Sequence, residues 1–201
     1  DMPALTSLTA IYKAFFDSAD SAILGKWAGT AASAASVESH LEVLDVASSW
    51  NSHYPPLPNT TRVSVHGLNA EELSANKIAH RRDVVNLNEE PALPYANDTF
   101  DFVTMAASVA YLTKPRAVFS EMHRVLKPGG VAIVSFSNRV FEEKATSVWL
   151  SNMDEEVALC SVVRNYFYFG PRAGWQNVSS ADASPHPSRG DPLWSVTAVK
   201  A

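Results

Sequence analysis

The chain has 201 residues, of which 46% are hydrophobic and 18% charged, and its formal net charge is −5 at pH 7. These values are typical of one folded domain with a sizeable core. No apolar run reaches the ~20 residues that span a bilayer, so we expect no transmembrane segment. The acidic balance without a basic patch argues against nucleic-acid binding. The single cysteine, Cys160, excludes an internal disulfide and a thiolate metal cluster, and it is expected in the core.

The N-terminal part predicts helix before the sheet begins. Apolar side chains recur at helical spacing over residues 3–16 and predict an amphipathic helix, whereas residues 18–39 are small and unpatterned and predict a weak helix or a long connection. We therefore expect a single domain over residues 1–201, with residues 1–40 as an N-terminal helical extension and residues 41–201 as the core. The core begins with predicted strands at 41–46, 63–66 and 83–85, and with a short helix at 71–76.

The most informative segment is LPYANDTFDFV, followed by VFSEMHRVLKPGGVAIVSF. It predicts a strand at 102–105, a helix at 115–126 with Glu121 and His123 on its solvent side, and a strand at 131–136. Pro115 is favoured in the first turn of a helix, and the sequence Lys-Pro-Gly-Gly ends the helix. This order predicts a right-handed crossover in a mostly parallel sheet.

The C-terminal third predicts the edge of the sheet. Residues 140–150 predict a helix, and the alternating patterns at 162–169 and 193–199 predict an antiparallel pair of strands. Residues 170–192 are rich in Gly, Pro and Ser and predict a long loop between these strands.

The central segment resembles the class I S-adenosylmethionine-dependent methyltransferases, in particular the type 11 group. The segments LEVLDVASSWNSHYPP, GLNAEEL, YLTKP, FSNRVFEEKA and DPLWSVTAVK are similar to a plant, algal and bacterial subgroup with an SSWxSH first loop. The resemblance implies an α/β fold, with a doubly wound, mostly parallel seven-stranded sheet of the Rossmann-like methyltransferase type and an antiparallel edge pair. It also implies S-adenosylmethionine as the cofactor and an unidentified small molecule as the methyl acceptor.

Ligands of such sheets bind beyond the carboxyl ends of the strands. With the resemblance, this position predicts a cofactor site formed by Asp45, Ser48, Ser49, Asn69, Asn86, Leu87 and Ser108. Asp45 matches the acid at the end of the first strand. Asn69 and Asn86 stand where the family usually has acids that hold the ribose hydroxyls and the adenine amino group. An amide loses the charge-assisted hydrogen bond, so we expect weaker binding, and both residues are equally consistent with turn formation.

The loop after the first strand lacks the glycines that are usual in the family. Ser48 and Ser49 are small enough for a close approach to a ligand, Trp50 is not, and Pro55-Pro56 disfavours the helix that normally follows. The polar candidates near a methyl acceptor are His53, Tyr111, Asn138 and Arg139, each with a structural alternative, such as a surface ion pair of Arg139 with Glu142 or Glu143. No metal is expected, since no group of His, Asp and Glu has the spacing of a metal site.

Two functions remain open. The first is a methyltransferase acting on a small molecule, because methyl transfer needs alignment more than acid–base groups. The second is a catalytically weak or inert methyltransferase-like subunit or assembly factor of a larger complex, in which cofactor binding has been lost. The subgroup implies a chloroplast location and a photosynthetic complex, with the cytoplasm as the alternative. The chain begins with Asp1, which indicates processing or trimming.

Overall fold

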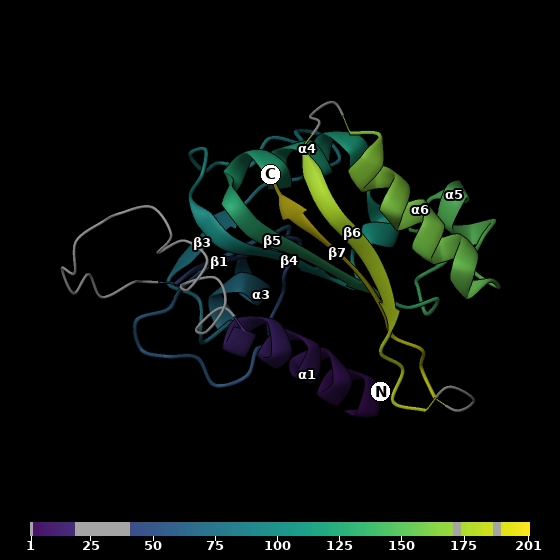
Figure 1. Ribbon diagram of the computed structural model, residues 1–201, viewed down its shortest axis with the longest axis horizontal. Helices are drawn as coiled ribbons and strands as arrows, with labels where there is room; N and C mark the ends of the chain where they lie inside the picture. Colours follow the sequence, from purple (N-terminus) through teal and green to yellow (C-terminus); the bar gives the residue numbers. More distant parts are fainter. Residues whose placement is uncertain (1, 19–40, 171–173, 187–189) are drawn as a thin grey trace.

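The computed structural model describes residues 2–18, 41–170, 174–186 and 190–201, and its centre is a seven-stranded sheet (Figure 1). The strand order is β3-β2-β1-β4-β5-β7-β6, in which β7 is antiparallel to both of its neighbours and the other adjacent pairs are parallel. The strands are β1 (Glu42–Asp45), β2 (Arg62–Gly67), β3 (Arg81–Val84), β4 (Phe100–Ala106), β5 (Leu126–Phe136), β6 (Trp175–Asp182) and β7 (Trp194–Lys200).

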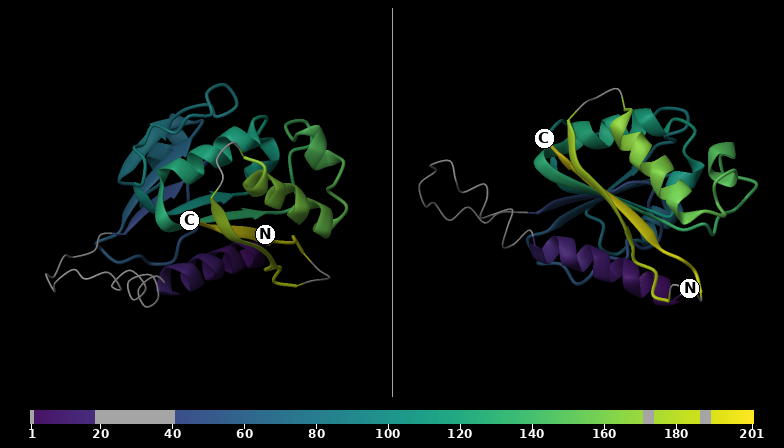
Figure 2. Two further views of the ribbon diagram at one scale, coloured as in Figure 1. Left: turned by 45° about the horizontal axis from the view of Figure 1, so that its top comes forward. Right: turned by 45° about the vertical axis from the view of Figure 1, so that its right-hand side comes forward.

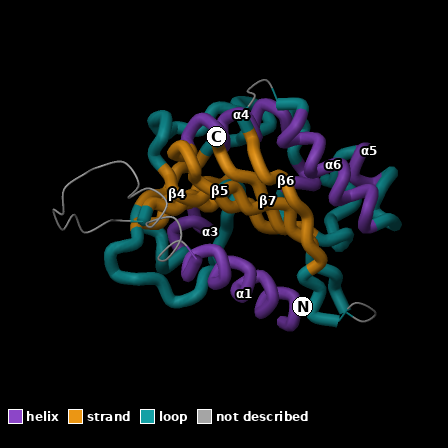
Figure 3. The backbone as a smooth tube through the Cα atoms, in the orientation of Figure 1, coloured by secondary structure: helices purple, strands orange, loops and turns teal. Residues whose placement is uncertain are grey.

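Helices cover both faces of the sheet, which confirms the doubly wound α/β fold (Figures 1 and 2). One face carries α1 (Met2–Ser18) and α3 (Ala70–Ala75), and the other carries α4 (Pro115–Val125) and α6 (Glu156–Tyr168). The tube in Figure 3 shows the strands as one continuous layer between these helices. None of the helices in the described ranges is both long and apolar enough to cross a membrane.

The two faces have separate cores. On the α4 and α6 face, buried side chains of the helices, including Phe119, Met122 and Phe167, pack on Leu44, Val103 and other strand residues. On the α1 face, Leu8, Tyr12 and Phe16 pack on strand residues of β1, β4 and β5, among them Val43, Phe102 and Ile133. Successive side chains of each strand point to opposite faces, so β1, β4 and β5 contribute apolar residues to both cores, as expected for a sheet buried on both sides.

The connection from β1 to β2 contains no helix. Pro55, Pro56 and Pro58 lie in it, and a proline ring is incompatible with a helix interior. Tyr54 fills the space between this connection and α1, because its ring packs edge-on against Tyr12 at 5.0 Å. The prediction that Pro55 and Pro56 disfavour the helix that normally follows this loop is thus confirmed.

The C-terminal third differs from the sequence-based predictions. Residues 162–169, predicted as a strand, belong to α6, whose buried residues Leu159, Val163 and Phe167 recur every fourth position. The partner of β7 is instead β6, which lies within the segment predicted as a loop. Only α5 (Ser147–Leu150) forms in the helix predicted at 140–150.

The prediction that Glu121 and His123 lie on the solvent side of α4 was also wrong. The ring of His123 is buried and contacts Trp175 edge-on at 4.9 Å. Glu121 forms an ion pair with Arg124 and accepts the Leu93 N–H. The cause is β6 and the 89–97 loop, which cover this side of the helix. The remaining predicted elements are confirmed to within a few residues, and most of the predicted connection at 18–39 lies outside the described residues.

The outermost strands of the sheet are polar. Most side chains of β6 are exposed, and its register shifts between Gln176 and Ser179, where Asn177 has a left-handed backbone with a φ of 53°. At the opposite end, β3 carries Arg81 and Arg82 on exposed positions.

Candidate functional site

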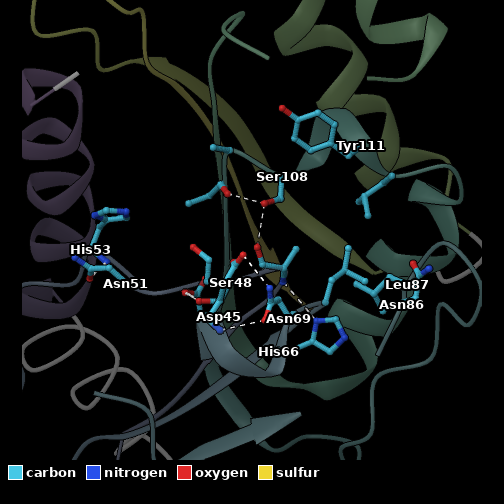
Figure 4. A pocket seen from close by; sticks show the side chains of 18 of the residues that line it. Asp45, Ser48, Asn51, His53, His66, Asn69, Asn86, Leu87, Ser108 and Tyr111 are labelled. Carbon is cyan, nitrogen blue, oxygen red and sulfur yellow. Dashed lines mark hydrogen bonds between the residues drawn. The ribbon is translucent and has the colours of Figure 1, made fainter. Parts of the chain in front are cut away.

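A pocket of about 480 Å³ lies at the carboxyl ends of β1 to β4, with the N-terminal half of α1 as one wall. All seven predicted cofactor residues line it, as do the acceptor-side candidates His53 and Tyr111. Figure 4 shows His53 on the α1 side and Tyr111, Asn86 and Leu87 across the pocket, with Asp45, Ser48 and Asn69 between them. Their location is as expected from the strand order, while their roles in binding remain predictions.

The loop after β1 reaches its compact shape without glycine. Ala47 has a φ of 55°, in the left-handed region that normally favours glycine, and the Ser48 N–H donates to His66 O at 2.7 Å. The close approach is made possible by Gly67 at the end of β2, where a Cβ would lie 2.5 Å from Ser48 O. The glycine that this turn needs therefore stands on the neighbouring strand.

Asp45 is a buried carboxylate in the pocket floor. It accepts hydrogen bonds from Ser48 Oγ at 2.6 Å and from Thr104 Oγ1 at 3.1 Å. Burial raises the pKa of Asp45 to about 6, and the hydroxyls of Ser48, Ser52 and Thr104 offset part of this rise. The carboxylate is therefore mostly ionised at neutral pH, at a cost in stability.

Asn69 and Asn86 both build local turns. Asn69 is the N-cap of α3, where its Oδ1 accepts the N–H groups of Glu71 and Glu72. Asn86 Oδ1 accepts the N–H of Asn88 at 3.1 Å, and its Nδ2 donates to Glu89. Both residues still line the pocket, but their amide oxygens already accept hydrogen bonds from backbone N–H groups.

Ser108 joins the loops that follow β1 and β4. Its hydroxyl donates to Ala47 O at 3.0 Å and lies 2.9 Å from Ala106 O. The preceding Ala107 has a φ of 51°, so both loops contain a left-handed alanine beside the pocket. Such residues are uncommon and occur where the surrounding structure fixes the backbone.

His53 and Tyr111 face each other across the open part of the pocket. The carbonyl of His53 accepts the Thr9 hydroxyl of α1 at 2.8 Å, and partial burial lowers the pKa of its imidazole. The Tyr111 hydroxyl accepts the Phe141 N–H at 3.0 Å and keeps its own proton for donation. A neutral imidazole and a phenol are thus available to a bound molecule.

Asn138 and Arg139 are not among the residues that line this pocket, so the structure does not bring them together with His53 and Tyr111. Arg139 forms an ion pair with Asp191 at 3.1 Å rather than with Glu142 or Glu143. In the described ranges, no group of three His, Cys, Asp or Glu side chains is placed to hold a metal ion.

Several residues that line the pocket were not predicted from the sequence. Leu5 and Leu8 belong to α1, His66 to β2, Glu72 to α3 and Asn88 to the loop after β3. Burial lowers the pKa of His66 to about 4, against the opposing effect of Asp83, so its ring is neutral. His66 and Asn88 could have been predicted from the sequence, because they lie near the carboxyl ends of the predicted strands. The residues on the two helices had no local signal, because helix placement over a pocket depends on tertiary packing.

Comparison with known proteins agrees with this geometry. Residues 44–134 match the methyltransferase domain family Methyltransf_11. The chain is 33% identical over 146 residues to the ubiquinone/menaquinone biosynthesis C-methyltransferase UbiE of Xylella fastidiosa, covering 66% of this chain and 56% of that protein. The chain spans between 27% and 56% of the lengths of the curated relatives that it matches.

Solved structures share the fold at low sequence identity. A SAM-dependent methyltransferase from Aquifex aeolicus is 20% identical with a TM-score of 0.50, covering 81% of this chain and 83% of that one. Phosphoethanolamine N-methyltransferase 2 from Haemonchus contortus, solved with S-adenosyl-L-methionine, is 12% identical with a TM-score of 0.52, covering 80% and 48%. The strand order, the pocket and the matched domain agree: residues 44–134 are similar to a methyltransferase domain, and the chain has the fold of the class I S-adenosylmethionine-dependent methyltransferases.

Proposed function

We propose that this chain binds S-adenosylmethionine in the pocket at the carboxyl ends of β1 to β4 and transfers its methyl group to a small-molecule acceptor. The observation that carries the proposal is the open pocket of about 480 Å³ in a chain that is similar to a methyltransferase domain. Pockets of roughly 300–1,000 Å³ hold ligands of cofactor size. The complex of the Haemonchus relative with S-adenosyl-L-methionine supports the choice of cofactor.

The residues of the pocket suit a displacement reaction. The bound cofactor supplies an electrophilic methyl group on a positively charged sulfur, and the protein has to align the acceptor and exclude water. An ionised Asp45 in the floor favours a cationic ligand. The apolar side chains of Leu5 and Leu8 shield one wall from solvent.

We place the methyl acceptor between α1 and Tyr111. This region offers Leu5 and Leu8, the neutral imidazole of His53 and the Tyr111 hydroxyl, which together fit a largely apolar molecule with one ionisable proton. In this proposal His53 takes that proton as the methyl group arrives. The bacterial relatives are named as C-methyltransferases of ubiquinone and menaquinone biosynthesis, so precursors of these quinones are the first acceptors to test.

In the alternative of an inert subunit, the pocket no longer has to hold a cofactor and can collapse around Trp50. Trp50 is instead 63% exposed and is not among the lining residues, which favours the enzyme. We retain the chloroplast as the proposed location, which subcellular fractionation tests.

Calorimetry with S-adenosylmethionine tests the cofactor, and transfer of a labelled methyl group to a panel of quinone precursors tests the reaction. We expect micromolar binding, and His53→Asn should lower the turnover rate about 100-fold while leaving cofactor affinity unchanged. Arg139→Gln, outside the pocket, serves as the matched control and should keep full activity. Absence of cofactor binding at millimolar concentration would overturn the proposal.

A further inference from the structure

The charge of Asp45 in the pocket floor is stabilised by hydroxyl groups rather than by a cation. Of the lining residues that the structure describes, none is a lysine or an arginine. The other titratable lining residues are His53, His66, Glu72 and Tyr111. Asp45 itself is only 3% exposed, so little water reaches its carboxylate. The hydroxyl groups around Asp45 therefore decide how readily it ionises.

Two hydroxyl groups form a hydrogen-bonded chain that ends on Asp45. Thr104 Oγ1 lies 3.1 Å from Asp45 Oδ1, and Tyr54 OH lies 2.6 Å from Thr104 Oγ1. The other acceptor within reach of Thr104, the oxygen of Leu44, is farther away at 3.5 Å. An ionised carboxylate only accepts hydrogen bonds, so Thr104 donates its single proton to Asp45 and accepts the proton of Tyr54. Both links of the chain therefore donate toward Asp45.

The ring of Tyr54 is held in place by α1. It packs edge-on against Tyr12 at 5.0 Å and against Phe16 at 5.3 Å. Phe16 in turn packs edge-on against Phe102 of β4 at 4.9 Å. Burial and the nearby charge of Asp45 raise the pKa values of Tyr12 and Tyr54 above the usual 10, so both phenols are neutral and keep their protons. The fixed ring thus directs a permanent donor at Thr104.

We propose that Tyr54 is a positioning residue, which acts through Thr104 to hold the Asp45 carboxylate ionised when the pocket takes up its ligand. The inference rests on the proposed function, since an ionised Asp45 favours the cationic S-adenosylmethionine. Tyr54 does not line the pocket, so its effect on a ligand passes through Thr104 and Asp45. The same ring contacts α1, which carries Leu5 and Leu8 of the pocket wall, so the packing of this wall and the charge of the floor are linked.

The test is Tyr54→Phe, which removes the hydroxyl and keeps the ring against α1. The titration of the Asp45 carboxyl group is followed by carbon NMR, and its midpoint in the parent is expected at about pH 6. In the variant the midpoint should rise by about 0.5–1 pH unit, as for the loss of one hydrogen bond in the chain. Calorimetry should then show affinity for S-adenosylmethionine reduced about two- to threefold at pH 6.5 and unchanged at pH 8, where Asp45 is ionised in both proteins.

Further variants separate the hydrogen-bonded chain from a general effect on packing. Thr104→Val should shift the midpoint further than Tyr54→Phe, because it removes the hydroxyl that contacts Asp45, whereas Thr104→Ser keeps a hydroxyl and should retain the parental midpoint. Tyr166→Phe, on α6 at the other face of the sheet, is the matched control and should leave the midpoint unchanged.

Two results would overturn the role of Tyr54. One is an unmoved midpoint in Tyr54→Phe. The other is a loss of affinity that is equal at pH 6.5 and pH 8, because Tyr54 would then act only through the packing of α1. If the parent binds no S-adenosylmethionine at either pH, the proposed function fails, while the NMR titration of Asp45 still decides whether Tyr54 controls its ionisation.

Discussion

The two faces of the sheet differ in what they bury. Under α4 and α6 the buried residues are chiefly apolar, and rings such as Phe119 and Phe167 pack edge-on at 4.7 Å. Under α1 the apolar core surrounds polar groups, including Asp45, Thr104 and the hydroxyl of Tyr54, which lies 2.6 Å from Thr104 Oγ1. The comparison teaches that the larger apolar core lies on one face, whereas the buried polar groups of the pocket floor lie on the other, where such groups lower stability unless they are paired.

The largest expected effect is on the apolar face. Phe119→Ala should lower the free energy of unfolding by about 3–5 kcal/mol, because the ring is fully buried and its removal leaves a cavity. Urea unfolding measures the loss. Affinity for S-adenosylmethionine in the fraction that remains folded should be unchanged, and a marked loss of affinity would contradict the separation of the two faces.

On the polar face, Asp45→Asn should change how stability depends on pH. The pKa of Asp45 is raised from 3.8 to about 6, so between these values the folded state binds a proton that the unfolded state does not. Stability should therefore fall as the pH rises from about 4 to 6, by on the order of 2–3 kcal/mol from this group.

Unfolding curves of the parent and Asp45→Asn at pH 4.5 and pH 7.5 isolate this effect, since the other titrating groups are common to both proteins. The variant should gain stability relative to the parent at the higher pH and lose affinity for the cationic cofactor. Equal pH dependence in the two proteins would show that burial does not raise this pKa.

Gly67→Ala tests the contact between β2 and the loop after β1. The added Cβ would lie 2.5 Å from Ser48 O, so the loop has to move, and we expect a loss of about 1–3 kcal/mol together with weaker cofactor binding. Gly170→Ala is the control, because a Cβ there meets nothing closer than 3.5 Å. Similar thermal midpoints for the two variants would contradict the role of Gly67.

Ala47→Gly should give the smallest effect, and in the opposite direction. The left-handed backbone of Ala47 is strained for a residue with a Cβ, and glycine relieves that strain while raising the entropy of the unfolded chain. Because these two effects oppose each other, we expect the free energy of unfolding to rise by only about 0.5 kcal/mol. Ala117→Gly, within α4, should instead lose about 1 kcal/mol, and calorimetric melting compares the two.

The parallel half of the fold was predictable because each of its elements has a strong local pattern. The apolar runs that give β1, β2, β4 and β5 lie between turn residues, and Pro115 marks the start of α4. The aromatic residues at 166–169 resemble a strand by propensity, but packing of Leu159, Val163 and Phe167 on the sheet makes the segment a helix. Conversely, β6 is mostly polar because it is an edge strand, so it resembled a loop.

The candidate site was predictable where it depends on strand ends. Asp45 ends β1, and Asn86 and Ser108 come shortly after β3 and β4, so the meeting of the carboxyl ends of these strands brings the three residues to one pocket. Glu72 and Leu5 were not predictable, because nothing in a helical pattern states which turn borders a pocket. The cap formed by Asn69 is the local alternative to a ligand contact, and only the structure shows that its oxygen is already bonded.

The polar outermost strands of the sheet have a consequence for the behaviour of the protein at high concentration. An unpaired strand edge is a template on which a second molecule can extend the sheet and begin an aggregate. The register shift at Asn177 bends β6 away from a straight edge. At β3 the edge is polar, since Arg81 and Arg82 are exposed and Arg81 forms an ion pair with Asp83 of the same strand. Both ends of the sheet thus oppose the stacking of one molecule onto the next.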